Sequence, residues 1–170
     1  SLIAAGHDSG MLVFKLDRQR PNFYCHADPQ NFRFFYMKDR QIINWRGDQN
    51  GDVLAYARKP HDGMKSGIRS MTYNSYSNSD ISILVQYDQD GGSYDLYSMP
   101  LDGPAGGQPA EPRKGVGTHA VFVARNRFAS LNSAGKICIY NFSNEIIKEI
   151  TGLPAEMKVV LLQHEAMMRQ

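Results

Sequence analysis

Short strand-like segments, separated by turn residues, recur along almost the whole of this 170-residue chain. Apolar, β-branched and aromatic runs bounded by Gly, Asp, Asn and Ser indicate an all-β sandwich, barrel or propeller. Most runs fall into three groups of about four, some forty residues apart, which favours the four-stranded antiparallel blades of a partial β-propeller. The predicted strands cover residues 3–6, 11–16, 32–36, 41–45, 52–58, 68–73, 81–87, 93–98, 120–124, 127–131, 136–140 and 145–150.

The first predicted hairpin differs in sequence from the later ones. Its turn at residues 7–10 contains Asp and Gly, and the strand that follows carries Phe14 and ends in Lys-Leu. This is typical of the last hairpin of a WD-repeat blade, with Phe14 in place of the usual Trp. Pro21 then interrupts strand pairing. We therefore expect residues 1–20 to close a preceding propeller and residues 21–170 to form the first blades of a second, within a longer chain.

Two segments between the predicted strands resemble loops. Residues 102–112 are rich in Pro and Gly, and we expect an exposed, mobile connection that forms neither strand ladder nor helix. Residues 58–67 predict a shorter loop of the same kind. Residues 156–170 suit a helix or a strand equally well. The Gly91-Gly92 pair lies where a hairpin turn belongs.

Composition limits the class of protein. Hydrophobic residues make up 42% and charged residues 21% of the chain, and the formal net charge is only +2, so the chain lacks the basic footprint of a nucleic-acid-binding protein. No run is long enough for a membrane span, and the start lacks the basic region of a signal peptide. Two distant cysteines, Cys25 and Cys138, predict reduced and buried thiols in an intracellular protein.

No catalytic, cofactor-binding or metal-binding residue can be assigned from the sequence, which predicts a protein that is not an enzyme. The histidines have no metal-like spacing to one another, to Cys or to carboxylates. Nucleophile elbows, Walker loops and dinucleotide-binding fingerprints are absent from the sequence. The Arg46-Gly47-Asp48 tripeptide fits a turn, and the many aromatic residues fit packing and cross-strand pairing better than base stacking. The five histidines are His7, His26, His61, His119 and His164.

Several strings resemble the coatomer α subunits, WD-repeat components of the COPI vesicle coat. The most specific runs from Ala120 to Ala129 and is followed by Leu131. Asp17 and Gln19 depart from the family pattern, residues 22–34 and 102–118 carry extra sequence, and residues 155–170 match loosely. The other matching strings are Ala4–Met11, Val13–Leu16, Arg18–Pro21, Tyr36–Arg40, Gly92–Tyr97 with Pro100, and Asn141–Glu145.

The resemblance implies a structural coat component that acts between Golgi and endoplasmic reticulum. It implies assembly with other coatomer subunits, above all β′, in the cytoplasm and on Golgi membranes and COPI vesicles, with peripheral membrane association only. The dilysine tails of cargo bind the family's first propeller, mostly upstream of residue 1, and no cargo-binding residue can be carried over to this chain. A β-propeller ligand-binding module or enzyme stays open as an alternative, and an RNA-binding domain is disfavoured by the charge. An unclosed propeller also predicts exposed blade faces, with runs such as 81–87 and 120–124, and self-association of the isolated chain.

Overall fold

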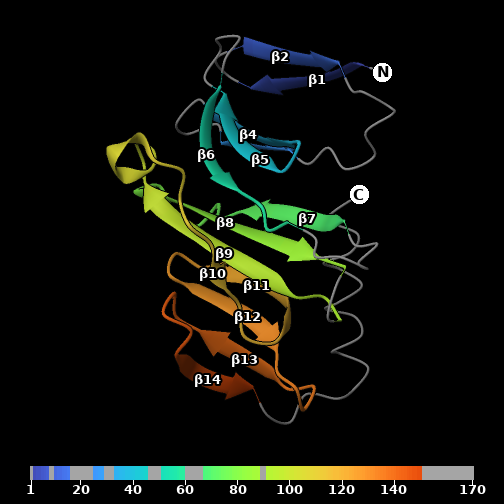
Figure 1. The fold of residues 1–170 in the computed structure, drawn as a ribbon, viewed down its shortest axis with the longest axis vertical. Helices are drawn as coiled ribbons and strands as arrows, with labels where there is room; N and C mark the ends of the chain where they lie inside the picture. Colours follow the sequence, from blue (N-terminus) through green and yellow to red (C-terminus); the bar gives the residue numbers. More distant parts are fainter. Residues whose placement is uncertain are drawn as a thin grey trace.

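Three four-stranded antiparallel sheets follow one another along the long axis of the molecule (Figure 1). This computed structural model describes the backbone of residues 2–7, 10–15, 25–28, 33–45, 51–59, 67–88 and 91–150, and the side chains of 34–44, 51–59, 67–88 and 91–150. Within each sheet the strands pair in chain order, each with the next, as in a propeller blade. The all-β, blade-like architecture predicted from the sequence is confirmed.

Ten of the twelve strands in the three sheets, here called the first, second and third blade, overlap predicted runs, whereas β3 and β10 were not predicted. The first blade consists of β3 (Cys25–Asp28), β4 (Arg33–Lys38), β5 (Gln41–Trp45) and β6 (Asp52–Tyr56). The second consists of β7 (Ile68–Tyr73), β8 (Asp80–Tyr87), β9 (Tyr94–Pro100) and β10 (Arg113–Lys114). The third consists of β11 (Thr118–Ala124), β12 (Arg127–Leu131), β13 (Ile137–Tyr140) and β14 (Ile146–Ile150).

The first hairpin forms a two-stranded sheet of its own. Its strands are β1 (Leu2–His7) and β2 (Gly10–Lys15), and His7 pairs with Gly10 beside the predicted turn. A second predicted turn is also present, because Gly91 and Gly92 take φ values of 71° and 106° between β8 and β9. Glycine adopts this left-handed region without the steric cost of a Cβ.

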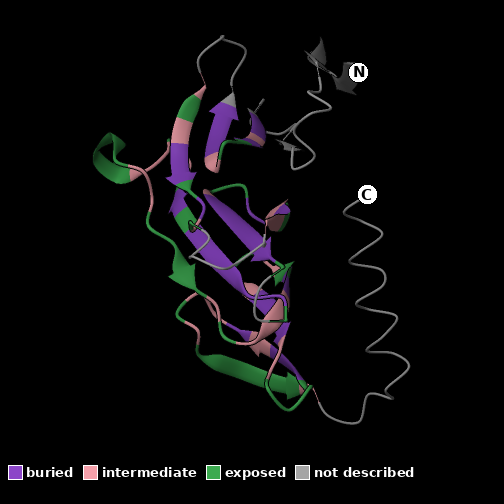
Figure 2. Cartoon of the chain, turned by 45° about the vertical axis from the view of Figure 1, so that its right-hand side comes forward, coloured by how far each residue is buried: buried purple, intermediate pink, exposed green. Residues whose placement is uncertain are grey.

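The second blade is buried on both faces, whereas the outer strand of the third blade is exposed (Figure 2). Successive residues of a strand point to opposite faces of its sheet. Accordingly, Ile81, Ile83 and Val85 of β8 pack with residues of the first blade, while Leu84 packs with residues of the third. The prediction that residues 81–87 lie on an exposed blade face is therefore wrong, because their blade lies between two others.

The connection after β9 also differs from its prediction. Residues 102–112 are mostly exposed, as expected, but they contain a short 3-10 helix, η1 (Ala105–Gly107). Ala110 forms a parallel bridge with Ala55, and its amide donates a 2.6 Å hydrogen bond to the carbonyl of Leu54 on β6. The connection thus joins the second blade to the outer strand of the first. The predicted 156–170 segment lies outside the described residues.

Candidate functional site

The candidate functional elements of this chain are the two interfaces between its blades. The first interface joins β4–β6 to β7–β9 through a core of mainly aliphatic side chains, including Ile42, Leu54 and Ile83. The second joins β8 and β9 to the third blade through a mainly aromatic core, including Tyr94, Phe122 and Phe128. Each interface also contains polar contacts that cross from one blade to the next.

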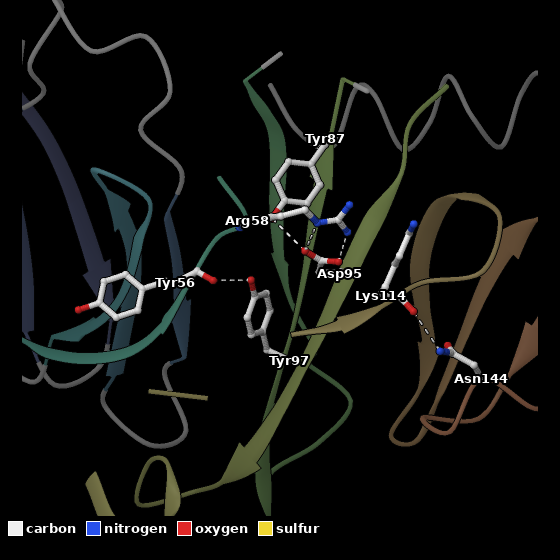
Figure 3. A network of polar contacts seen from close by, with 7 residues as sticks. All are labelled: Tyr56, Arg58, Tyr87, Asp95, Tyr97, Lys114 and Asn144. Carbon is white, nitrogen blue, oxygen red and sulfur yellow. Dashed lines mark hydrogen bonds and ion pairs between the residues drawn. The ribbon is translucent and has the colours of Figure 1, made fainter. Parts of the chain in front are cut away.

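An ion pair between a half-buried guanidinium and a buried carboxylate crosses the first interface (Figure 3). Asp95 lies on β9, and its side chain is only 1% exposed. Arg58, two residues beyond the end of β6, forms the ion pair with it, and the Arg58 Nε donates a 3.2 Å hydrogen bond to Asp95 Oδ2. Two donors in a fixed fork match the two oxygens of a carboxylate, and this bidentate geometry is the strongest form of the interaction.

Tyr87 on β8 completes this network. Its hydroxyl donates a 3.1 Å hydrogen bond to Asp95 Oδ2 and accepts a 2.8 Å hydrogen bond from the backbone amide of Arg58. The Arg58 guanidinium carbon lies 5.1 Å from the centre of the Tyr87 ring, within cation–π range. Tyr87 and Asp95 of the second blade therefore both bond to Arg58, which follows the last strand of the first blade.

The electrostatics of the network favour a fixed protonation state. The hydrogen bond to Asp95 raises the pKa of Arg58 above its ordinary value, so the guanidinium stays charged. Burial, followed by the nearby Asp95 charge, raises the pKa of Tyr87 to about 12. Burial also raises the pKa of Tyr97, whose hydroxyl donates a 2.7 Å hydrogen bond to the carbonyl of Tyr56 on β6. Arg58, Tyr87 and Tyr97 therefore keep their protons near neutral pH.

The second interface is joined by neutral hydrogen bonds. The Tyr94 hydroxyl donates to the carbonyl of Val116 at 2.8 Å, and burial raises the pKa of Tyr94 to about 12. This approach requires a glycine at position 115, since a Cβ there would lie 2.1 Å from the Tyr94 ring. At the outer edge, Asn144 Nδ2 donates a 3.1 Å hydrogen bond to the carbonyl of Lys114 on β10 (Figure 3).

Of the five histidines considered in the sequence, only His119 has a described side chain. His119 is half-buried, with a positive φ of 58° and its Nδ1 2.9 Å from the Thr118 hydroxyl. The side chains of His7, His26, His61 and His164 lie outside the described residues. Across the described side chains, no three His, Cys, Asp or Glu residues gather as they would around a metal ion. Cys138 is a buried free thiol, as predicted, and the side chain of Cys25 is outside the described part.

Sequence reasoning did not find the residues that join the blades. Arg58 was placed at the start of a loop and Asp95 within a strand, and the two lie 37 positions apart. The local pattern carries one signal only: a charged residue inside a strand that is otherwise apolar.

Within the described ranges, no helix is long and apolar enough to cross a bilayer.

Meandering four-stranded sheets, stacked face to face and joined by such contacts, define a segment of a β-propeller. Proteins with related sequences include coatomer α subunits from several organisms. The chain is 43% identical over 164 residues to coatomer subunit alpha-3 of Oryza sativa subsp. japonica, and the match covers 94% of this chain. It is 36% identical over 148 residues to coatomer subunit alpha of Dictyostelium discoideum and 32% identical over 152 residues to that of Saccharomyces cerevisiae.

The chain is therefore homologous to a segment of the coatomer α subunits, and the resemblance seen in the sequence is confirmed. It spans only 13%, 11% and 12% of the length of these three relatives. No protein-family model matches the chain. One solved structure, titled as a complex of the fission yeast SREBP-SCAP binding domains, covers 91% of this chain and 47% of its own, at 11% identity and a TM-score of 0.41. That likeness is too low to bear on fold or function.

Proposed function

We propose that this chain is a propeller segment of a COPI coat subunit and serves as a non-catalytic scaffold for protein interactions. The observation that carries the proposal is the similarity to coatomer α subunits, which extends over 87–94% of the chain in the three relatives described. The structure adds physical support, because stacked blades with a buried ion pair between them form a rigid platform with loops on both faces.

The homology also suggests partners and a location. Other coatomer subunits are the proposed partners, with β′ the foremost. The proposed location is the cytoplasmic face of Golgi membranes and COPI vesicles, where the protein attaches peripherally through the coat. Dilysine cargo tails would bind the propeller upstream of this segment and not the segment itself. No cofactor and no nucleic acid enters this proposal.

The division of the chain into two propellers belongs to the same proposal. The β1–β2 hairpin pairs with no other strand among those described, which supports its assignment to a preceding propeller within residues 1–20. Residues 21–170 would then supply the first blades of the second propeller. A structure of the full-length protein tests this boundary: the hairpin should complete a blade that lies upstream of β3.

Isolation of the tagged full-length protein from its own cells tests the scaffold function. We expect the other coat subunits to co-purify in near-equal amounts, β′ included, and fluorescence of the tagged protein to coincide with Golgi markers. A full-length protein that purifies without coat subunits and lies away from the Golgi would overturn the proposal.

The isolated 170-residue chain should self-associate, because the described part of the third blade exposes several apolar side chains. Val121 and Val123 on β11 are 39% and 40% exposed, and Ile146 and Ile147 on β14 are 60% and 49% exposed. Covering a few hundred Å² of apolar surface is worth several kcal/mol at about 25 cal/mol per Å². Light scattering at micromolar concentration should show dimers or larger species, and a strict monomer would contradict this expectation.

A further inference from the structure

An exposed tyrosine and two arginines lie at the junction of the second and third blades. Tyr76, in the loop between β7 and β8, is 61% exposed. Arg125, in the turn between β11 and β12, is exposed, and Arg127, the first residue of β12, is half-exposed. The sequence analysis attributed the aromatic residues as a group to packing, but the structure exposes the side chain of Tyr76. These three residues are here called the junction surface.

The side chain of Asn74 ties the loop and the turn together. Asn74 is completely buried, and its Nδ2 donates hydrogen bonds to the carbonyls of Ala124 at 3.3 Å and Arg125 at 2.9 Å. Its Oδ1 accepts a 3.0 Å hydrogen bond from the amide of Tyr76. One buried amide group therefore positions the backbone of both Tyr76 and Arg125.

Further hydrogen bonds hold the rest of the loop. The Ser77 hydroxyl donates to Asp80, and the carbonyl of Ser77 accepts a 3.4 Å hydrogen bond from Tyr73. The Arg125 guanidinium donates to the hydroxyl of Ser79, which adds a second link between the blades. The loop is thus fixed while the Tyr76 ring points outward, and a fixed loop loses little entropy when a partner binds.

The junction surface carries uncompensated positive charge. Among the described residues, neither Arg125 nor Arg127 forms an ion pair; their guanidinium groups donate only to Ser79 and to the carbonyl of Asn126. The acidic residue next to the loop is Asp80, the first residue of β8, and it accepts the hydrogen bond from Ser77. Both guanidinium groups therefore keep N–H donors that can bind another molecule. Carboxylates suit them, because guanidinium groups bind carboxylates through paired hydrogen bonds.

We propose that the junction surface binds an acidic segment of a partner protein. Carboxylates of the segment would pair with Arg125 and Arg127, and an apolar side chain beside them would pack on the Tyr76 ring. Tyrosine and arginine are the residue types that most often carry the binding energy of protein interfaces, particularly when the surface is ordered before binding. This inference goes beyond the coat assignment and does not depend on it.

Site-specific photo-crosslinking in the full-length protein tests the proposal. The variant Tyr76→p-benzoylphenylalanine is produced in cells, irradiated and digested, and the attached peptides are sequenced. We expect crosslinks to peptides with a net negative charge. The added double substitution Arg125→Glu with Arg127→Glu should lower the crosslink yield by about tenfold or more, as expected for arginines that anchor an interface.

A matched control separates a local effect from one of net charge. Arg113→Glu with Lys114→Glu alters the charge by the same amount on exposed β10 residues and should leave the yield unchanged. Because the glutamates could perturb the fold, Arg125→Ala with Arg127→Ala serves as a second variant, and it should also lower the yield at an unchanged melting temperature. Crosslinks to basic or neutral peptides, or no crosslinks at all, would overturn the proposal. So would an equal loss of crosslink yield in the control variant, or binding of the protein only to phosphatidylserine vesicles.

Discussion

The two interfaces between the blades are held together by different chemistry. The first contains mainly aliphatic side chains and closes with the charged pair Arg58–Asp95. The second is organised around Phe128, which stacks on Tyr140 at 5.5 Å and contacts Tyr94 edge-on at 5.7 Å between ring centres. Aliphatic packing tolerates small shifts between sheets, whereas a buried ion pair is costly unless both partners meet correctly. The pair can therefore fix the position of one blade on the next where side-chain shape alone would not.

Replacement of Phe128 by Ala should have the largest effect and should break the second interface. Phe128 is fully buried and contacts three other aromatic rings, so its loss leaves a large cavity. We expect a loss of about 3–5 kcal/mol in the stability of the third blade. Hydrogen exchange of backbone amides should show β12 and β13 losing protection before β4 and β5. Simultaneous loss of protection in all three blades would show that the interfaces open as one unit.

Replacement of Asp95 by Asn should break the first interface with a slightly smaller effect. The change keeps the side-chain shape but leaves the Arg58 charge without its partner. Removal of one member of a buried pair costs about 3–5 kcal/mol, and we expect the lower part of that range because 31% of the Arg58 side chain is exposed. Protection of backbone amides from hydrogen exchange should now fall first in β5 and β6. Asp88→Asn, at an exposed neighbouring position, is the control and should leave exchange unchanged.

Alkaline pH should weaken both interfaces through their buried tyrosines. Tyr87 and Tyr94 have pKa values raised to about 12, against about 10 when unfolded. The unfolded chain therefore loses these protons first as pH rises. The stability that the tyrosines contribute is complete below pH 10 and is lost between about pH 10 and pH 12. Tyr94→Phe should make this decline shallower by up to about 1.4 kcal/mol per pH unit. Identical alkaline profiles for the variant and the unchanged protein would contradict this explanation.

The sequence predicted strands well where apolar residues alternate between turn signals. Both β8 and β14 were expected from their isoleucines, but one is buried on both faces and the other is largely exposed. Local periodicity cannot distinguish them, because burial depends on which sheets lie on either side. Two strands were missed. β3 (Cys25–Asp28) has only four residues and no β-branched or large apolar side chain, and β10 consists of the charged pair Arg113–Lys114.

The contacts between the blades could not be predicted for a related reason. Arg58 and Asp95 meet only after two sheets have formed and stacked, so no short-range pattern marks them. Asn74 likewise bonds to carbonyls 50 and 51 positions away, in another blade. Its side-chain oxygen also accepts a hydrogen bond from the Tyr76 amide, as in an ordinary Asx turn, so the local sequence gives no sign of a contact between blades. The family resemblance supplied what the local pattern lacked, namely the order and spacing of motifs along the whole chain.

The smallest effect is expected at the other ion pair of the described side chains, which lies at the protein surface. Lys136 Nζ is 2.9 Å from Glu149 Oε1, but the two side chains are 51% and 38% exposed. Glu149 raises the pKa of Lys136, yet water already solvates both charges and salt screens their attraction. Lys136→Ala should therefore leave the exchange of β13 and β14 amides unchanged, at low and at high salt. A loss as large as that of Asp95→Asn would mean that burial is not what distinguishes the two pairs, and the role assigned to the Arg58–Asp95 contact would need revision.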